Sequence, residues 1–179
     1  MPTVIANRYA RALADVLAAT GNYLPVLKEL EDFAVLYRES AELREVSETP
    51  AVAMAQKLGV LEALTRRLES SHVTRNFLRV LASHYRLPLL EEVIQAFRNV
   101  AYARLGIVRV RISSPALLTN EEQALLRARF DELTRQQSEL EFHLDSELIG
   151  GIVAQIGSTV YDGSIRGYLD RIREQLMAQ

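Results

Sequence analysis

The spacing of the apolar residues first changes at Gly106, and this change sets the fold class. Before Gly106, apolar residues recur at steps of three and four, which is the spacing of amphipathic helices. After it, apolar and charged residues alternate over residues 108–112, which is typical of a half-exposed strand. The sequence therefore predicts an α+β protein, with an all-α part at residues 1–105 and a small α/β module at residues 106–179.

The N-terminal part contains six amphipathic segments, which predict a six-helix bundle. Gly21 ends the first helix, Thr49 and Pro50 are expected to cap and open the fourth, and Pro88 begins the sixth. In the fifth helix, residues 72–85, apolar side chains cover about 200° of the helical wheel, roughly twice what packing on one side requires. Two interpretations follow: either neighbours cover a central helix, or this face forms a groove with the first helix for a partner's amphipathic helix.

The C-terminal module is expected to contain short strands and two helices. Thr119 and Glu122 form a capping box, which begins a helix that runs to about Gln137. Further strands are predicted at residues 139–144, 152–156 and 160–161. A final helix follows a turn. The residues expected to face inward from the two helices are Leu126, Phe130 and Leu133 in the first, and Ile165, Leu169, Ile172 and Leu176 in the last.

Composition excludes several kinds of chemistry. The 179 residues include no cysteine, so there is no disulfide, thiolate metal site or cysteine nucleophile. Only two of the 21 basic residues are lysines, and none follows Lys57, so no phosphate-binding loop lysine is available. The three histidines, at positions 72, 84 and 143, do not have metal-ligand spacing. The sequence predicts no catalytic residue, no cofactor and no metal site.

Charge and hydropathy also limit the partners. With a formal net charge of −2, the chain lacks the overall positive charge on which nucleic-acid binding depends, so no nucleic-acid partner is expected. No apolar run reaches the roughly 18 residues of a spanning helix, so no direct membrane insertion is expected. Arg8 and Arg11 interrupt the first apolar residues, which favours a structural helix over a secretory signal.

Three stretches together resemble a known family along the whole chain. They are residues 7–13, residues 76–81, and the glycine-rich motif at residues 150–157 followed by residues 162–169. The last stretch is the most specific. The chain resembles the delta subunit of F-type ATP synthase, which in mitochondria is called the oligomycin-sensitivity-conferring protein.

The resemblance implies a non-catalytic stator protein of the peripheral stalk. In that family an N-terminal six-helix bundle sits on the catalytic head and holds the N-terminal amphipathic helix of an alpha subunit between helices one and five. The C-terminal module binds the C-terminal ends of the b subunits. The stalk keeps the head from turning with the rotor, so proton flow is coupled to ATP synthesis. For a bacterial chain this implies a peripheral position at the cytoplasmic face of the inner membrane.

The resemblance also suggests site residues. Tyr9 and Val80 match positions that contact the alpha subunit, and the helical wheel adds Ala6, Leu13, Asn76 and Phe77 as neighbours. A second set is expected to be structural, forming turns and a helix cap: Gly150, Gly151, Gly157, Asp162, Gly163 and Ser164. The positions that depart from the family pattern are Ala14, Gln155, Tyr161 and Tyr168, and no single residue is assigned to the contact with the b subunits.

Two other classes of function remain to be compared with the stator. A general helical adaptor would use the same groove and would bind unrelated amphipathic helices about equally well. An enzyme would need a convergent set of titratable groups, which the sequence does not provide.

Overall fold

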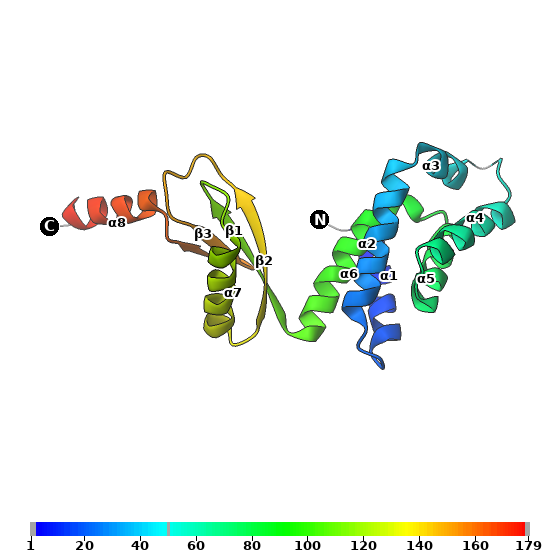
Figure 1. Cartoon of the computed structure of the whole chain (residues 1–179), viewed down its shortest axis with the longest axis horizontal. Coiled ribbons are helices and arrows are strands. Elements are labelled where there is room, and N and C mark those ends of the chain that lie inside the picture. Colours follow the sequence, from blue (N-terminus) through cyan, green and yellow to red (C-terminus); the bar gives the residue numbers. More distant parts are fainter. Residues whose placement is uncertain (1–2, 50, 178–179) are drawn as a thin grey trace. The chain divides into compact units, whose positions relative to one another are not determined.

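The structure is a computed structural model that describes residues 3–49 and 51–177, and the chain divides into two compact units, Met1–Ala101 and Tyr102–Gln179. The helical part comprises α1 (Val4–Leu17), α2 (Tyr23–Glu39), α3 (Ala41–Glu48), α4 (Met54–Arg67), α5 (His72–Ser83), the short 3-10 helix η1 (Leu87–Leu89) and α6 (Leu90–Leu105) (Figure 1). The division falls inside α6, whereas the sequence placed it after the helix, at Gly106. The predicted α+β class is confirmed.

The fourth helix begins later than predicted. The backbone N–H of Val52 donates to the carbonyl of Thr49 at 3.3 Å in a turn, and α4 starts only at Met54, after extended backbone at Ala53. The residue that precedes α4 is Ala53 and not Thr49, so the predicted cap at Thr49 is wrong. Ala53 has no side-chain oxygen that could cap the helix. Pro50 lies outside the described residues.

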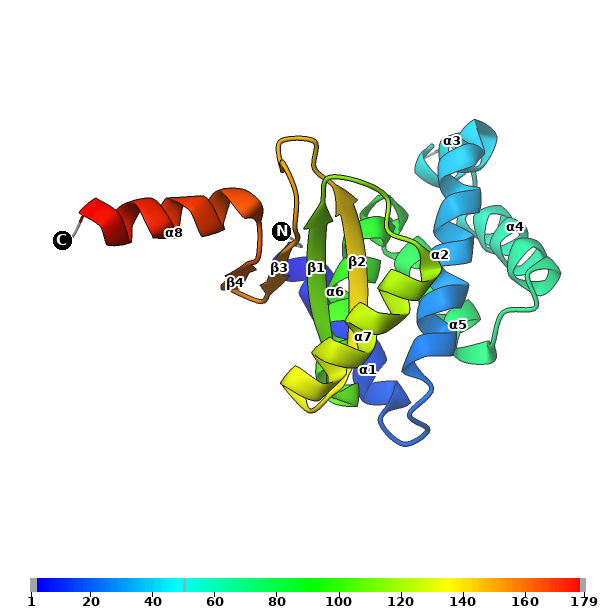
Figure 2. The same ribbon diagram turned by 60° about the vertical axis from the view of Figure 1, so that its left-hand side comes forward.

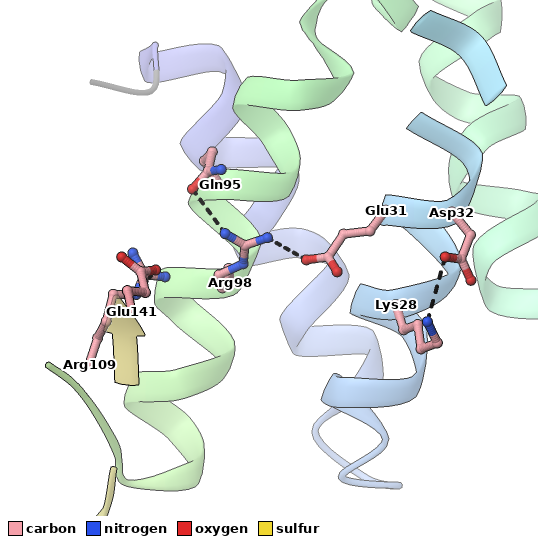
Figure 3. A network of polar contacts seen from close by, with 7 residues as sticks. All are labelled: Lys28, Glu31, Asp32, Gln95, Arg98, Arg109 and Glu141. Carbon is pink, nitrogen blue, oxygen red and sulfur yellow. Dashed lines mark hydrogen bonds and ion pairs between the residues drawn. The ribbon is translucent and has the colours of Figure 1, made fainter. Parts of the chain in front are cut away.

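The core of the bundle is mainly apolar and is formed by α1, α2, α5 and α6. Its largest fully buried side chains include Leu30 and Phe33 of α2, Leu78 and Leu81 of α5, and Val93 and Phe97 of α6. An ion pair between Glu31 and Arg98 joins α2 to α6 at the edge of this core, and Figure 3 shows Gln95 on the other side of the guanidinium.

The second unit is built on a four-stranded sheet with the order β2–β1–β3–β4. Its elements are β1 (Ile107–Ser114), α7 (Asn120–Thr134), β2 (Gln137–Leu144), β3 (Val153–Ile156), β4 (Thr159–Asp162) and α8 (Ile165–Met177). β1 and β2 are parallel and α7 connects them, while β3 pairs antiparallel with both β1 and β4. Figure 2 shows α7 lying across the sheet, and α8 leading away from it.

The face of the sheet under α7 forms the core of the second unit. Val110 and Ile112 are fully buried there and pack with Phe130 of α7, as their alternation with charged residues predicted. Leu126 packs at the edge of this core. The prediction for Leu133 is wrong, because its side chain is 60% exposed near the end of α7. Of the apolar residues in α8, Ile165 and Leu169 are also exposed.

Candidate partner-binding surfaces

Two aromatic side chains meet between α1 and α5. The rings of Tyr9 and Phe77 lie edge to face, with centroids 6.4 Å apart and an interplanar angle of 75°. Aromatic rings favour this arrangement because the positive edge of one ring faces the negative face of the other. Tyr9 is half-buried and Phe77 is 9% exposed, so the pair joins the two helices while part of Tyr9 reaches the surface.

Two of the predicted contact residues belong to the core instead. Ala6 is fully buried and Leu13 is 3% exposed, so neither offers a surface to a partner in this structure. Both lie on the half of α1 that packs into the bundle, together with Ala10 and Leu17. The apolar arc of α1 is broader than one buried face, and the sequence could not show which half is covered. Ala6 and Leu13 are therefore core residues in this structure, and their contact with a partner stays a prediction.

The other half of the arc reaches the surface, where Ile5 and Tyr9 are half-buried and Ala12 and Val16 are exposed, and it contains residues that the prediction missed. Ile5, Tyr9, Ala12 and Val16 follow one another at steps of four, three and four, so they form a row along one side of α1. Val16 is 66% exposed, and Val80 on α5 is 44% exposed. We call the residues of this surface the α1–α5 face: Ile5, Tyr9, Ala12, Val16, Phe77 and Val80.

Asn76 lies one helical turn before Val80 on α5, so it borders the α1–α5 face. It is exposed, and its side-chain amide nitrogen lies 3.2 Å from Nδ1 of His72, one helical turn earlier. Both residues line a groove between α4 and α5. Of the six predicted residues, two therefore lie in the core, three belong to the α1–α5 face, and Asn76 lies between that face and this second groove.

The glycine motif brings together two segments that are distant in sequence, one before β3 and one after β4. The backbone N–H of Gly163 donates to the carbonyl of Ile152, and that of Ile165 donates to the carbonyl of Gly150, both at 3.0 Å. Gly151 has a φ of +80°, and a Cβ there would lie 2.3 Å from the carbonyl oxygen of Gly163. A side chain would therefore separate the two segments.

The polar residues of the motif begin α8. A carboxylate oxygen of Asp162 accepts a hydrogen bond from the backbone N–H of Ser164 at 2.8 Å. The hydroxyl of Ser164, which is 3% exposed, accepts one from the backbone N–H of Gly167 at 3.0 Å. Side-chain oxygens commonly satisfy the first N–H groups of a helix in this way. Gly157, with a φ of +59°, forms the turn between β3 and β4.

The α8 helix carries apolar side chains that its own unit leaves exposed. Those described are Ile165, Tyr168, Leu169 and Met177, which are 48%, 60%, 56% and 74% exposed. The side chains of Ile172 and Leu176 lie outside the described residues. In both views α8 leads away from the sheet.

The described residues contain neither a cluster that could bind a metal ion nor a helix that could span a membrane. Among them no three histidine or acidic side chains are grouped closely enough to hold a metal ion. No described helix has both the length and the apolar character needed to cross a lipid bilayer. The pKa of Glu122 is lowered, but its cause is the hydrogen bonds from the backbone N–H and hydroxyl of Thr119 in the cap of α7.

Comparisons with known proteins cover nearly the whole chain. The model of the family "ATP synthase delta (OSCP) subunit" matches residues 5–176. The ATP synthase subunit delta of Acidobacterium capsulatum is 40% identical over 174 residues, which are 96% of each chain. The ATP synthase subunit delta of Myxococcus xanthus is 38% identical over 174 residues, which are again 96% of each chain.

Solved structures agree with the sequence matches. A chain in the cryo-EM structure of the Toxoplasma gondii mitochondrial ATP synthase hexamer matches 99% of this chain and 99% of its own length, with a TM-score of 0.72 and 26% identity. A chain of the Polytomella F-ATP synthase shares the fold over 58% of this chain and 91% of its own, with a TM-score of 0.52 and 22% identity. On the sequence matches and the shared fold, this chain belongs to the ATP synthase delta (OSCP) subunit family.

Proposed function

We propose that this chain is the peripheral-stalk subunit of an F-type ATP synthase, linking the catalytic head to the b subunits. Membership of the delta (OSCP) family over residues 5–176 supports this role, which is structural rather than catalytic. As a stator the protein holds the head against the torque of the rotor, so that proton-driven rotation is coupled to ATP synthesis. Its expected position is peripheral, attached through the complex to the cytoplasmic face of a bacterial inner membrane.

The α1–α5 face is the proposed site for the N-terminal amphipathic helix of an alpha subunit. The observation that carries this assignment is the Tyr9–Phe77 pair, which lies beside apolar side chains left exposed on both helices. Burying four or five such anchors contributes roughly 8–15 kcal/mol before costs. Association and ordering cost about 4–15 kcal/mol. Because these ranges overlap, tight attachment needs a second contact elsewhere on the chain, which raises the effective concentration of the first.

Calorimetry on the full chain tests this site. A peptide that copies the N-terminal helix of the cognate alpha subunit should bind the unaltered protein, and Val80→Asp should weaken binding by about tenfold or more. Val35→Asp is the matched control, because Val35 is 43% exposed on α2, close to the 44% of Val80. Circular dichroism should show unchanged helix content for both variants. No binding by the unaltered chain, or equal losses for both variants, would disprove the assignment.

A general helical adaptor is the alternative use of the same face. It would bind unrelated amphipathic helices of equal length and apolar content about as tightly as the peptide from the alpha subunit. The stator hypothesis predicts a clear preference for the cognate peptide over such helices and over its own scrambled sequence. Titrating all three peptides into one protein preparation separates the two functions.

The C-terminal module is the proposed site for the C-terminal ends of the b subunits. The support is that Ile165, Tyr168 and Leu169, which steps of three and four place on one side of α8, are exposed. An apolar side of this kind suits another amphipathic helix. Leu169→Asp should reduce co-purification with a fragment that contains the C-terminal end of the b protein. Leu125→Asp is the control, because Leu125 is 65% exposed on α7. Equal retention of the fragment by both variants would exclude α8 as the contact.

A further inference from the structure

A side-chain contact bridges the turn that connects α6 to β1. The boundary between the two compact units falls between Ala101 and Tyr102, so the last turn of α6, up to Leu105, belongs to the second unit. The guanidinium carbon of Arg109, the third residue of β1, lies 5.4 Å from the centroid of the Tyr102 ring. Gly106 lies between the two in sequence. The contact is therefore wholly within the second unit, and it spans the point at which the helix ends and the strand begins.

Arg109 is also paired with Glu141 of β2. Its Nε lies 3.3 Å from a carboxylate oxygen of Glu141, the two side chains are 27% and 31% exposed, and Figure 3 shows them side by side. Because Val110 and Leu140 face α7 in the core, their neighbours Arg109 and Glu141 extend from the opposite face of the sheet. Side chains from α6, β1 and β2 thus form one connected set, which we call the α6–sheet clasp: Tyr102, Arg109 and Glu141.

Partial burial makes the contacts of the clasp stronger than those of an exposed arginine. A cation over an aromatic ring is attracted to the negative face of the ring, and the attraction grows as water is removed. Nε and Nη2 of Arg109 are buried and have no acceptor in hydrogen-bonding geometry among the described residues. The guanidinium therefore depends on the ring of Tyr102 and on the charge of Glu141.

The backbone at Gly106 restrains the connection only weakly. Its φ is +66°, where glycine is favoured, and a Cβ there would meet no described atom within 4 Å. Its N–H donates to the carbonyl of Ala103 at 3.4 Å, which is long for such a bond. Restraint of the turn between α6 and β1 therefore has to come from side chains on either side of it.

We propose that the α6–sheet clasp restrains the connection between the two units. While Tyr102, Arg109 and Glu141 stay in contact, the last turn of α6 and the sheet move as one body, and turning at Gly106 requires the clasp to open. The inference goes beyond the proposed function, because it depends only on contacts within the second unit and holds whatever each unit binds.

NMR relaxation and hydrogen exchange of the isotope-labelled full chain test the proposal. Arg109→Gln removes the cation, so the two units should tumble more independently, and the apparent rotational correlation time of each should fall. Amide exchange in the last turn of α6 should accelerate roughly two- to thirtyfold, the range expected for losing a cation–π contact. Arg111→Gln is the matched control, because Arg111 is exposed and makes the same change of charge on the same face of β1. No effect of Arg109→Gln, or equal effects of the two substitutions, would overturn the proposal.

Two substitutions of Tyr102 separate the clasp from folding. Tyr102→Leu should act as Arg109→Gln does, and the double variant should add little, because either change alone opens the clasp. Tyr102→Phe keeps the ring and should keep most of the restraint. Exchange of the β1 and β3 amides should stay unchanged in every variant; faster exchange throughout the sheet would assign these residues to the stability of the second unit and would contradict the proposal. Simple addition of the two effects, or a Tyr102→Phe variant that behaves like Tyr102→Leu, would also contradict it.

Discussion

The ring of Tyr9 on α1 rests edge to face against the ring of Phe77 on α5, with 6.4 Å between their centroids. This contact joins two helices that are more than fifty residues apart in sequence. It also lies at the boundary between the two apolar halves of α1. The buried half of α1 packs into the bundle, while the half that carries Tyr9 stays at its boundary with solvent.

Tyr9→Ala should weaken both the fold and the proposed binding of the helix from the alpha subunit. An edge-to-face aromatic pair contributes about 0.5–1.5 kcal/mol beyond the area that it buries. We therefore expect the free energy of unfolding, measured with urea, to fall by roughly 1–3 kcal/mol. Peptide affinity, measured by calorimetry, should fall as well. Tyr9→Phe keeps the ring and should change neither quantity by much; a large effect of Tyr9→Phe would mean that the hydroxyl, and not the ring, is responsible.

Glu29→Gln should loosen the start of α5. The carboxylate of Glu29 on α2 accepts hydrogen bonds from the backbone N–H of Ser71 at 2.9 Å and from the Ser71 hydroxyl at 2.8 Å, and it also bonds the hydroxyl of Thr74. Hydrogen bonds to a charged group contribute roughly 1.5–3 kcal/mol, so the loss should be about 1–2 kcal/mol after the amide makes partial replacements.

The matched control for Glu29 lies three residues later on the same helix. Asp32 pairs with Lys28 at 3.6 Å, and both side chains are more than half exposed. Asp32→Asn makes the same change of charge, but an exposed pair of this kind contributes only about 0.3–0.5 kcal/mol. Urea unfolding of both variants distinguishes the specific contact from a general effect of charge. Equal losses would show that Glu29 acts only through its charge.

Gly151→Ala should destabilise the C-terminal module more than Gly157→Ala does. Both glycines have positive φ, at which a Cβ costs roughly 1–2 kcal/mol. Only at Gly151 would the Cβ also overlap backbone, 2.3 Å from the carbonyl oxygen of Gly163, whereas at Gly157 it would meet no described atom within 4 Å. Hydrogen exchange of the β3 and β4 amides should therefore accelerate far more in Gly151→Ala. Similar exchange in the two variants would mean that the close approach contributes nothing.

Periodicity predicted the elements well because it reports one-sided burial directly. The change of spacing at Gly106 located the end of α6 and the start of β1, and the alternation about Val110 and Ile112 identified the inward face of that strand. The capping box of Thr119 and Glu122 is present as expected, because the interaction involves only four consecutive residues. Local patterns of this kind need no knowledge of the rest of the fold.

The residues that were misplaced depend on long-range packing. Ala6 and Tyr9 are adjacent on one apolar arc, and only the position of the bundle decides that the first is buried and the second half-exposed. Lys57, for which the sequence made no structural prediction, depends on the fold in the same way. Its side chain is 4% exposed, its ammonium donates to the carbonyl of Ser47 at 2.9 Å, and it lies 5.0 Å from the ring centroid of Tyr85. Nothing in the local sequence indicates a buried lysine.

The cap of α7 should make a contribution to stability that disappears in acid. The carboxylate of Glu122 accepts hydrogen bonds from the backbone N–H of Thr119 at 2.7 Å and from its hydroxyl at 2.8 Å, and these lower its pKa from the ordinary value of 4.5. The unfolded chain therefore takes up the proton at a higher pH than the folded chain does. The contribution is complete above the ordinary pKa and is lost as the pH falls through the lowered one.

Two variants test that dependence. Thr119→Val removes the hydroxyl but keeps the backbone N–H, which is the larger cause, so the pKa of Glu122 followed by NMR should rise only part of the way toward 4.5. Glu122→Gln should be less stable to heat than the unaltered chain at neutral pH, because its amide is a weaker acceptor. As the pH falls through the lowered pKa, the unaltered chain loses its carboxylate and the two melting temperatures should converge. A difference that stays constant with pH would show that Glu122 acts through helix propensity or packing and not through its charge.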